Sequence, residues 1–265
     1  MTKSTNDKVT VVILAGGLGT RLREETEYRP KPMVNIGRWP VLWHIMKIFS
    51  QSHFNDFVIC LGYKGDMIKD YFLQYRMMSN DFTIHLNRRK VDIHNEQGHT
   101  PWKVTLADTG IRSMTGSRIK QIQKYVKGDT FLMTYGDGVA DIDIKKLLQF
   151  HKSHGKLATI TGVPPPSRFG ELLVEGSRVV EFSEKPQTHR DLINGGFFVL
   201  DRKVFDYIDD DETSVFEKKP LERLASKGQL MVYPHKGFWH CMDTLRDMQY
   251  LNELWEKGDA PWKVW

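Results

Sequence analysis

Cysteine is scarce in this chain of 265 residues, which contains only Cys60 and Cys241. Two cysteines cannot build the disulfide framework on which small secreted domains depend, and they cannot form a cysteine-rich zinc site. The composition therefore favours a protein of a reducing compartment, and we expect it in the cytoplasm.

Long hydrophobic runs are also missing, because no apolar stretch approaches the length needed to cross a bilayer. The apolar segment 9–15 is short, follows Asp7 and Lys8, and runs directly into glycines. A buried strand that feeds a glycine loop explains it better than a signal peptide. We expect no membrane partner.

A strong excess of one charge is absent as well. The chain has 38 Lys and Arg against 33 Asp and Glu, a formal net charge of +5. This mild excess suits phosphorylated substrates and is too weak to indicate nucleic acid. The basic run 88–90 lacks the interleaved aromatic side chains of single-strand binders, so we expect no nucleic-acid partner.

What the chain does contain is an alternation of strand and helix patterns. Buried strands are predicted at 9–14, 57–61 and 131–135, and Pro40 and Asp66 each stand where a helix begins. This order indicates a parallel sheet with helices on its faces, and the fold class is α/β. Further strands are predicted at 157–163, 172–175, 179–183, 196–200 and 230–233, and helices at 144–154, 202–208, 216–227 and 244–257.

The segment 74–103 interrupts that rhythm, and we interpret it as an excursion with one short strand at 82–86. Its histidines, His85, His94 and His99, are irregularly spaced, which favours surface or interface residues over metal ligands. With no linker or repeat elsewhere, we expect a single domain over 1–265, a loose leader at 1–8, and subunit contacts at 74–103 and in the apolar tail 261–265.

A glycine-rich loop follows the first strand. Gly17 and Gly19 begin a dinucleotide fingerprint, but Leu22 stands where the third glycine belongs, which disfavours a dehydrogenase. No Gly-Lys-Ser/Thr closes a P-loop either. Glycines let backbone N–H groups approach phosphate oxygens, although a tight turn alone is the competing interpretation. The candidate nucleotide-binding residues here are Leu14, Ala15, Gly16, Gly17, Leu18, Gly19, Thr20 and Arg21.

Two basic residues strengthen the phosphate interpretation. Arg21 offers a bidentate fork for phosphate, and Lys31 is a compact positive charge between Pro30 and Pro32. Because the two prolines fix φ on both sides, the lysine is held in a stiff segment.

The string G-G-L-G-T-R followed by R-P-K-P-M resembles the signature of the sugar-1-phosphate nucleotidyltransferases. The resemblance continues through 104–118, 135–141, 184–186, 193–198, 237–247 and 254–263, so it covers the chain from about residue 9 to the end. It implies a Rossmann-like nucleotidyltransferase fold with a mixed, mostly parallel central sheet flanked by helices, with a small extension. It also points to the members of the family that transfer a cytidylyl group.

The expected metal ligands are Asp137 and Asp243. Asp137 leaves the end of a buried strand, where ligands bind in open α/β sheets. Asp243 opens the last helix, and its position alone favours a helix N-cap. The resemblance instead implies that both carboxylates hold Mg²⁺, which prefers carboxylate oxygens together with substrate phosphates.

The resemblance also implies the roles of the other site residues. Lys31, Arg21 and Asp137 would be catalytic, and Lys185 would hold the sugar phosphate. Arg118 would donate to the O2 and N3 edge of cytosine, where thymine and uracil carry an N3–H donor. The sugar-phosphate set is Tyr135, Glu184, Lys185, Asn194 and Gly195, and the remaining nucleotide-binding residues are Lys31, Ser113, Thr115, Gly116, Arg118 and Gly136. Strand-entry and turn roles are the competing interpretation for Lys185 and Asn194.

The activity implied is Mg²⁺-dependent transfer of CMP from CTP to α-D-glucose 1-phosphate, giving CDP-glucose and pyrophosphate. The expected product would serve CDP-linked deoxysugars of surface polysaccharide, including lipopolysaccharide. The expected assembly is a homo-oligomer, a hexamer being one form. The alternatives are a thymidylyl- or uridylyltransferase on the same fold, and a catalytically silent homologue that binds nucleotide.

Overall fold

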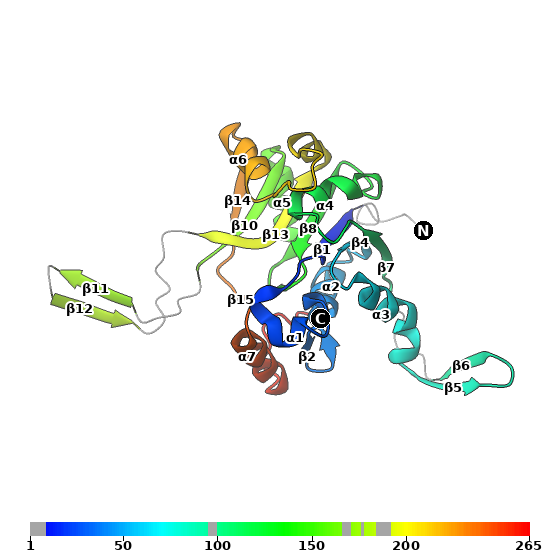
Figure 1. Ribbon diagram of the computed structural model, residues 1–265. Helices are drawn as coiled ribbons and strands as arrows, with labels where there is room; N and C mark the ends of the chain where they lie inside the picture. The colour runs from blue at the N-terminus through cyan, green and yellow to red at the C-terminus, as the bar shows by residue number, and fades with distance from the viewer. Residues whose placement is uncertain (1–8, 95–99, 166–170, 176–177, 184–191) are drawn as a thin grey trace.

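A seven-stranded sheet forms the centre of the computed structural model, which describes residues 9–94, 100–165, 171–175, 178–183 and 192–265. The strand order is β14-β10-β13-β8-β1-β4-β7 (Figure 1). Strand β13 is antiparallel to both neighbours, and the remaining pairs are parallel. The expected mixed, mostly parallel sheet is confirmed. The strands are β1 (Thr10–Leu14), β4 (Asp56–Leu61), β7 (Lys103–Asp108), β8 (Thr130–Tyr135), β10 (Ala158–Val163), β13 (Ile193–Asp201) and β14 (Leu230–Pro234).

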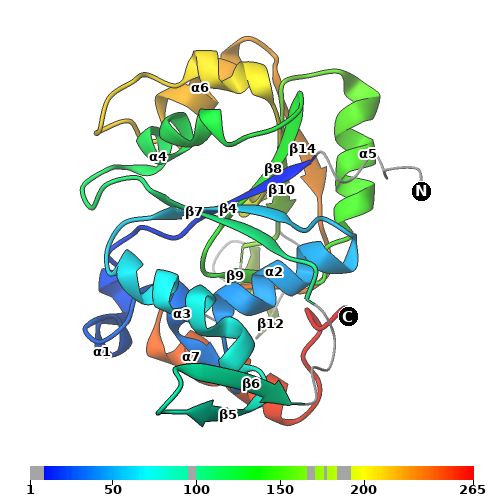
Figure 2. The same ribbon diagram turned by 90° about the vertical axis from the view of Figure 1, so that its right-hand side faces the viewer.

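Both faces of this sheet are covered, because its central strands are apolar on both sides. Figure 2 shows helices α2 (Val41–Gln51), α3 (Gly65–Met78) and α7 (Leu245–Glu256) on one side, and α4 (Thr115–Gln121) and α6 (Lys219–Ser226) on the other. Alternate residues of β1 divide between two buried clusters: Val11 and Ile13 enter one, and Val12 and Leu14 the other. Helix α5 (Ile144–His154) adds to the first cluster.

A short antiparallel ladder beside the main sheet was not predicted from the sequence. Strand β9 (Gly138–Ala140) pairs with β15 (Trp239–Cys241), with Gly138 opposite Cys241. Strand β9 directly follows the loop at the carboxyl end of β8, the end at which open α/β sheets bind ligands. The ladder therefore brings the segment after residue 241 to that end of the sheet.

The excursion contains more structure than expected. Helix α3 runs to Met78, and a hairpin of β5 (Asp81–His85) and β6 (Lys90–His94) replaces the single strand expected at 82–86. Figure 1 shows this hairpin projecting from the body of the molecule. Helix α3 has Lys64 rather than Asp66 at its N-cap, so the cap prediction for Asp66 is wrong. The strands predicted at 172–175 and 179–183 are confirmed, and they form an antiparallel hairpin of β11 (Glu171–Glu175) and β12 (Arg178–Ser183).

The predicted boundaries of three helices hold in part. The helix expected at 144–154 is α5, which Asp143 caps by accepting from the Lys146 N–H and Gly155 ends in the left-handed region. The segment expected to be helical at 202–208 is a 3-10 helix over Arg202–Tyr207, and α6 begins at Lys219 rather than at 216. The other short elements are η2 (Thr20–Leu22), α1 (Arg23–Thr26), η3 (Lys31–Met33), β2 (Asn35–Ile36), β3 (Trp39–Pro40) and η4 (Ile122–Lys124).

The apolar tail packs on its own chain. Trp262 is fully buried in the first cluster, and its indole N–H lies 3.3 Å from Nδ1 of the buried His44. The expectation that 261–265 is a subunit contact is therefore wrong for Trp262. Among the described residues, no helix is both long enough and apolar enough to cross a membrane.

Candidate active site

A cleft of about 570 Å³ opens at the carboxyl ends of β1 and β8. Most of the predicted site residues line it, although they come from six separate parts of the sequence. The lining residues are Leu14, Ala15, Gly16, Gly17, Gly19, Thr20, Arg21, Lys31, Pro32, Ser113, Met114, Thr115, Arg118, Thr134, Tyr135, Gly136, Asp137, Gly138, Asn194, Gly195, Gly196, Glu217, Trp239, Cys241 and Asp243. Leu18 and Gly116 are the predicted residues, among those described, that this lining does not include.

The glycine loop forms one wall of the cleft. A Cβ on Gly16 would lie 2.3 Å from the Arg118 guanidinium, so only glycine fits there. Gly19 adopts a left-handed φ of 66°, which glycine tolerates without strain. Gly17 has no atom within 4 Å of the position its Cβ would take, so its backbone is open to an incoming group. This wall is suited to contact with phosphate oxygens through backbone N–H groups.

Lys31 lies between two carboxylates at the base of the cleft. Its Nζ donates to Asp137 Oδ2 at 2.7 Å and to Asp243 Oδ1. The Lys31 side chain is only 10% exposed. Burial alone would lower the pKa of Lys31, but the charge of Asp137 and the hydrogen bonds to both carboxylates outweigh it and leave this pKa raised. Lys31 is therefore a permanent ammonium ion.

Arg21 also reaches this group, because its Nη1 donates to Asp243 Oδ2 at 2.6 Å. Two cations thus face two carboxylates. The Arg21 side chain is 69% exposed, so its ion pair with Asp243 holds it weakly. Arg21 is therefore free to exchange this partner for a phosphate.

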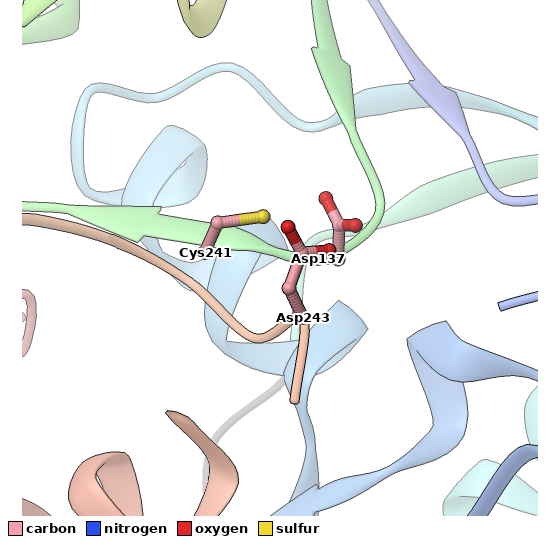
Figure 3. Close-up of side chains that lie close together, drawn as sticks. All are labelled: Asp137, Cys241 and Asp243. Carbon is pink, nitrogen blue, oxygen red and sulfur yellow. The ribbon is translucent and has the colours of Figure 1, made fainter. Parts of the chain in front are cut away.

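The last helix begins in a way that frees Asp243. Thr244, and not Asp243, is the N-cap of α7: its Oγ1 accepts from the Asp247 N–H while Asp247 Oδ2 accepts from the Thr244 N–H. The cap role that position alone favoured for Asp243 is wrong. Its carboxylate points instead toward Asp137, with the Cys241 sulfur nearby (Figure 3).

The chemistry of this group fits a magnesium ion. One ligand atom from each of Asp137, Cys241 and Asp243 lies within 4.8 Å of the other two. Burial, and then the charges of Asp137 and Asp243, raise the pKa of the Cys241 thiol, which keeps it protonated and unsuited to a hard cation. The carboxylates of Asp137 and Asp243 are the oxygen ligands available here.

Arg118 makes structural contacts that the sequence did not predict. Its Nη1 donates to the oxygens of Leu61, Thr109 and Gly110, and its Nη2 donates to Gly16 O at 3.0 Å. The guanidinium therefore ties the glycine loop to the loop after β7. Burial lowers its pKa, with Cys60 and Asp108 opposing the shift, but arginine stays charged. Base recognition by Arg118 stays a prediction. It would have to use the N–H groups of the guanidinium that do not make these hydrogen bonds.

The other residues predicted to contact the base differ in whether they line the cleft. Ser113 and Thr115 line the cleft, whereas Gly116 packs against the neighbouring loop. A Cβ on Gly116 would lie 2.6 Å from Ser214 Oγ and 2.8 Å from Ser214 O. The glycine is needed for close packing of α4, so a nucleotide-binding role for Gly116 is not supported by its position.

Tyr135 and Asn194 are brought together in the lining of the cleft. Asn194 Nδ2 donates to the Tyr135 hydroxyl at 3.2 Å, and that hydroxyl donates to Glu217 Oε1 at 2.5 Å. Burial and the nearby Glu217 raise the pKa of Tyr135, so it remains a neutral donor. The Trp239 indole donates to Gly195 O at 2.6 Å and fixes the strand entry. Glu184 and Lys185, also predicted for the sugar phosphate, lie outside the described residues.

Sequence reasoning assigned no site role to Glu217, Trp239 or Cys241, whose side chains also line the cleft. Trp239 lies in the segment 237–247 that carries part of the family resemblance, but the ladder of β9 and β15 that positions it was not predicted. Glu217 carries no local signal, because Phe216-Glu217-Lys218 is an ordinary sequence at the start of a helix.

A family model described as nucleotidyl transferase matches residues 10–256. The chain belongs to the nucleotidyl transferase family. It is 55% identical over 255 residues to the glucose-1-phosphate cytidylyltransferase of Salmonella typhi, covering 96% of this chain and 98% of the relative. The protein of the same name from Salmonella typhimurium is 55% identical over the same shares.

A crystal structure of HddC from Yersinia pseudotuberculosis has a similar fold. It aligns with a TM-score of 0.66 at 26% identity, covering 93% of this chain and 99% of that one. A nucleotidyl transferase joins a nucleotide to an acceptor. The cleft combines a glycine loop, the charged group of Lys31 with its two carboxylates, and the hydroxyl of Tyr135. This arrangement has the parts that such a transfer needs.

Proposed function

We propose that this nucleotidyl transferase moves CMP from CTP to α-D-glucose 1-phosphate, giving CDP-glucose and pyrophosphate. The observation that carries the proposal is the position of Lys31, buried between Asp137 and Asp243 where the glycine wall meets the Tyr135 wall. The Salmonella relatives that carry this activity in their names support the choice of substrates.

The transfer is a direct displacement at phosphorus. An oxygen of the sugar phosphate attacks the α-phosphorus of CTP, and the bond from that phosphorus to the bridging oxygen breaks as pyrophosphate leaves. No covalent intermediate with the enzyme is needed, so the protein contributes positioning and charge neutralisation. The glycine wall and Arg21 bind the triphosphate, and Lys31 stabilises charge near the α-phosphate and the leaving group.

The proposed cofactor is Mg²⁺, held by Asp137 and Asp243. When bound, it would neutralise charge on the reacting phosphates. The two carboxylates already converge on one cation, the Lys31 ammonium. Lys185 is proposed to hold the sugar phosphate, and Ser113, Thr115 and Arg118 to recognise the base.

The proposed assembly is a homo-oligomer, with the 74–103 excursion as a contact. The β5–β6 hairpin exposes apolar side chains at Phe82, Ile84 and Val91, which favours contact with another protein surface. Sedimentation showing a stable monomer at working concentration would overturn this part. The proposed place of the product is in supplying CDP-linked deoxysugars for surface polysaccharide.

Pyrophosphate release tests the proposal, measured with glucose 1-phosphate and Mg²⁺ against CTP, dTTP, UTP, ATP and GTP. We expect release with CTP well above the others. A preference for dTTP or UTP would keep the chemistry and overturn the choice of base. No release with any nucleotide, from folded protein that still binds one, would favour the silent homologue.

A further inference from the structure

Glu217 is a carboxylate in the cleft wall with no role in the transfer described above. It is half-buried and follows Phe216, whose ring is fully buried in the second apolar cluster. The Phe216 N–H donates to Thr115 Oγ1 at 2.9 Å. The backbone beside Glu217 is therefore fixed on one side by packing and on the other by a hydrogen bond.

The carboxylate itself is held by two hydroxyl groups. Tyr135 donates to Oε1 at 2.5 Å, and Thr115 donates to Oε2 at 2.5 Å. A carboxylate offers about four acceptor positions, so these two bonds leave acceptor capacity directed at the cleft that Glu217 lines. Holding both oxygens in this way limits the rotation of the side chain and pre-aims the remaining lone pairs.

The chemistry of the remaining lone pairs selects their partner. A carboxylate repels a phosphate, and neither proposed substrate carries a cationic group, so the substrate group that bonds to Glu217 is an uncharged donor. Its neighbours Tyr135 and Asn194 also line the cleft, and Tyr135 leads directly into Gly136 and Asp137. In the proposed reaction the acceptor is a hexose phosphate, whose ring hydroxyls are uncharged donors.

We propose that Glu217 is the residue that reads a hydroxyl of the hexose, by accepting a hydrogen bond from it while Tyr135 and Thr115 hold the carboxylate. The proposal rests on the proposed function, since the hexose is the acceptor in that reaction. In this proposal Thr115 orients the Glu217 carboxylate, in addition to its proposed contact with the base.

Kinetics that combine enzyme variants with deoxy analogues of the sugar substrate test the proposal. Wild-type enzyme and Glu217→Gln are compared with glucose 1-phosphate and with its 2-, 3-, 4- and 6-deoxy analogues, at saturating CTP. The amide keeps the shape and one acceptor oxygen, so it preserves packing and loses charge. Glu222→Gln is the matched control, because it replaces a carboxylate by an amide at an exposed position of α6.

With wild type, one deoxy analogue should lose about ten- to a hundredfold in kcat/KM, the range typical of a hydrogen bond to a charged group. With Glu217→Gln, that analogue and glucose 1-phosphate should react at rates within about threefold of each other, while the KM for CTP stays near that of wild type. Glu217→Asp keeps the charge but moves the carboxylate oxygens away from the cleft. It is the second variant if Glu217→Gln does not fold, and it should show the same loss of discrimination between the two sugars.

Three results would overturn the role of Glu217 while leaving the transfer itself standing. The first is an equal loss for all five sugars, which is the signature of a purely structural residue. The second is no loss at all. The third is a lowered preference for CTP over UTP with an unchanged deoxy-sugar pattern, which would assign Glu217 to the base. A wild-type enzyme that releases no pyrophosphate with any nucleotide would instead overturn the proposed function and this inference together.

Discussion

The Met242 N–H donates to the carbonyl oxygen of Asp137 at 2.9 Å. This bond continues the β9–β15 ladder by one step and places the residue after Met242 beside Asp137. Asp243 therefore reaches the same ammonium group as Asp137, although the two lie far apart in sequence. The pairing of the two carboxylates depends on this backbone contact.

Replacing Lys31 should remove charge stabilisation during transfer and leave the binding of the sugar phosphate intact. Lys31→Met should lower kcat by about a hundredfold or more, the effect expected when a pre-aimed donor is lost. The KM for glucose 1-phosphate should change by less than about threefold. Steady-state pyrophosphate release checks this, with the exposed Lys152→Met as the matched control. Full activity in Lys31→Met would remove Lys31 from the mechanism.

Loss of one carboxylate should weaken the proposed magnesium site. Asp243→Asn keeps an oxygen for Arg21 and Lys31 but loses its charge, so half-maximal activity should require about tenfold more Mg²⁺. Isothermal titration with Mn²⁺ in place of Mg²⁺ should show a matching loss of affinity. The exposed Asp259→Asn should bind Mn²⁺ as wild type does. Unchanged Mn²⁺ affinity in Asp243→Asn would show that Asp243 is not a ligand.

Two glycines of the site region should respond to alanine in opposite ways. Gly17→Ala should leave stability within about 0.5 kcal/mol, because no atom lies near its Cβ position, yet raise the KM for CTP. Gly116→Ala should cost about 1 to 2 kcal/mol of folding free energy, because its Cβ meets Ser214. Urea denaturation and CTP kinetics separate the two effects. A destabilised Gly17→Ala with normal KM would mean that the loop is a structural turn.

The buried His44 should make stability fall in mild acid. Its Nδ1 faces the Trp262 indole N–H, a donor only, and its Nε2 lies 3.0 Å from Ile36 O, so the ring is neutral with the proton on Nε2. Burial lowers the pKa of His44 from 6.5 to about 4, against an opposing effect of the bond to Ile36. The unfolded chain therefore binds the proton first, and stability present above pH 6.5 is lost as the pH falls toward about 4.

At pH 5 this single group should cost about 2 kcal/mol relative to pH 7.5. His44→Gln keeps an acceptor and a donor without the titration, so its unfolding free energy should fall less over this range, even though it starts lower. Chemical denaturation at a series of pH values measures both curves. Parallel curves for wild type and His44→Gln would contradict the assignment to His44.

Local patterns in the sequence were sufficient for the glycine loop, the apolar strands and the helix capped by Asp143. Each is encoded by neighbours within a few residues: a continuous apolar run for β1, helical spacing for α2, and Asp and Gly at the two ends of α5. The glycine loop and the candidate residues Lys31 and Asp137 could be predicted from these short segments and from the family resemblance.

Only the tertiary structure decided how those segments meet. The pairing of β9 with β15 depends on backbone groups that are distant in sequence, and three-residue strands have too little periodicity to be recognised. The choice of Thr244 over Asp243 as the cap depended on where the helix enters, one residue later than expected. Glu217 joined the site through the hydroxyls of Thr115 and Tyr135, contacts that exist only once α4, β8 and the start of α6 pack together.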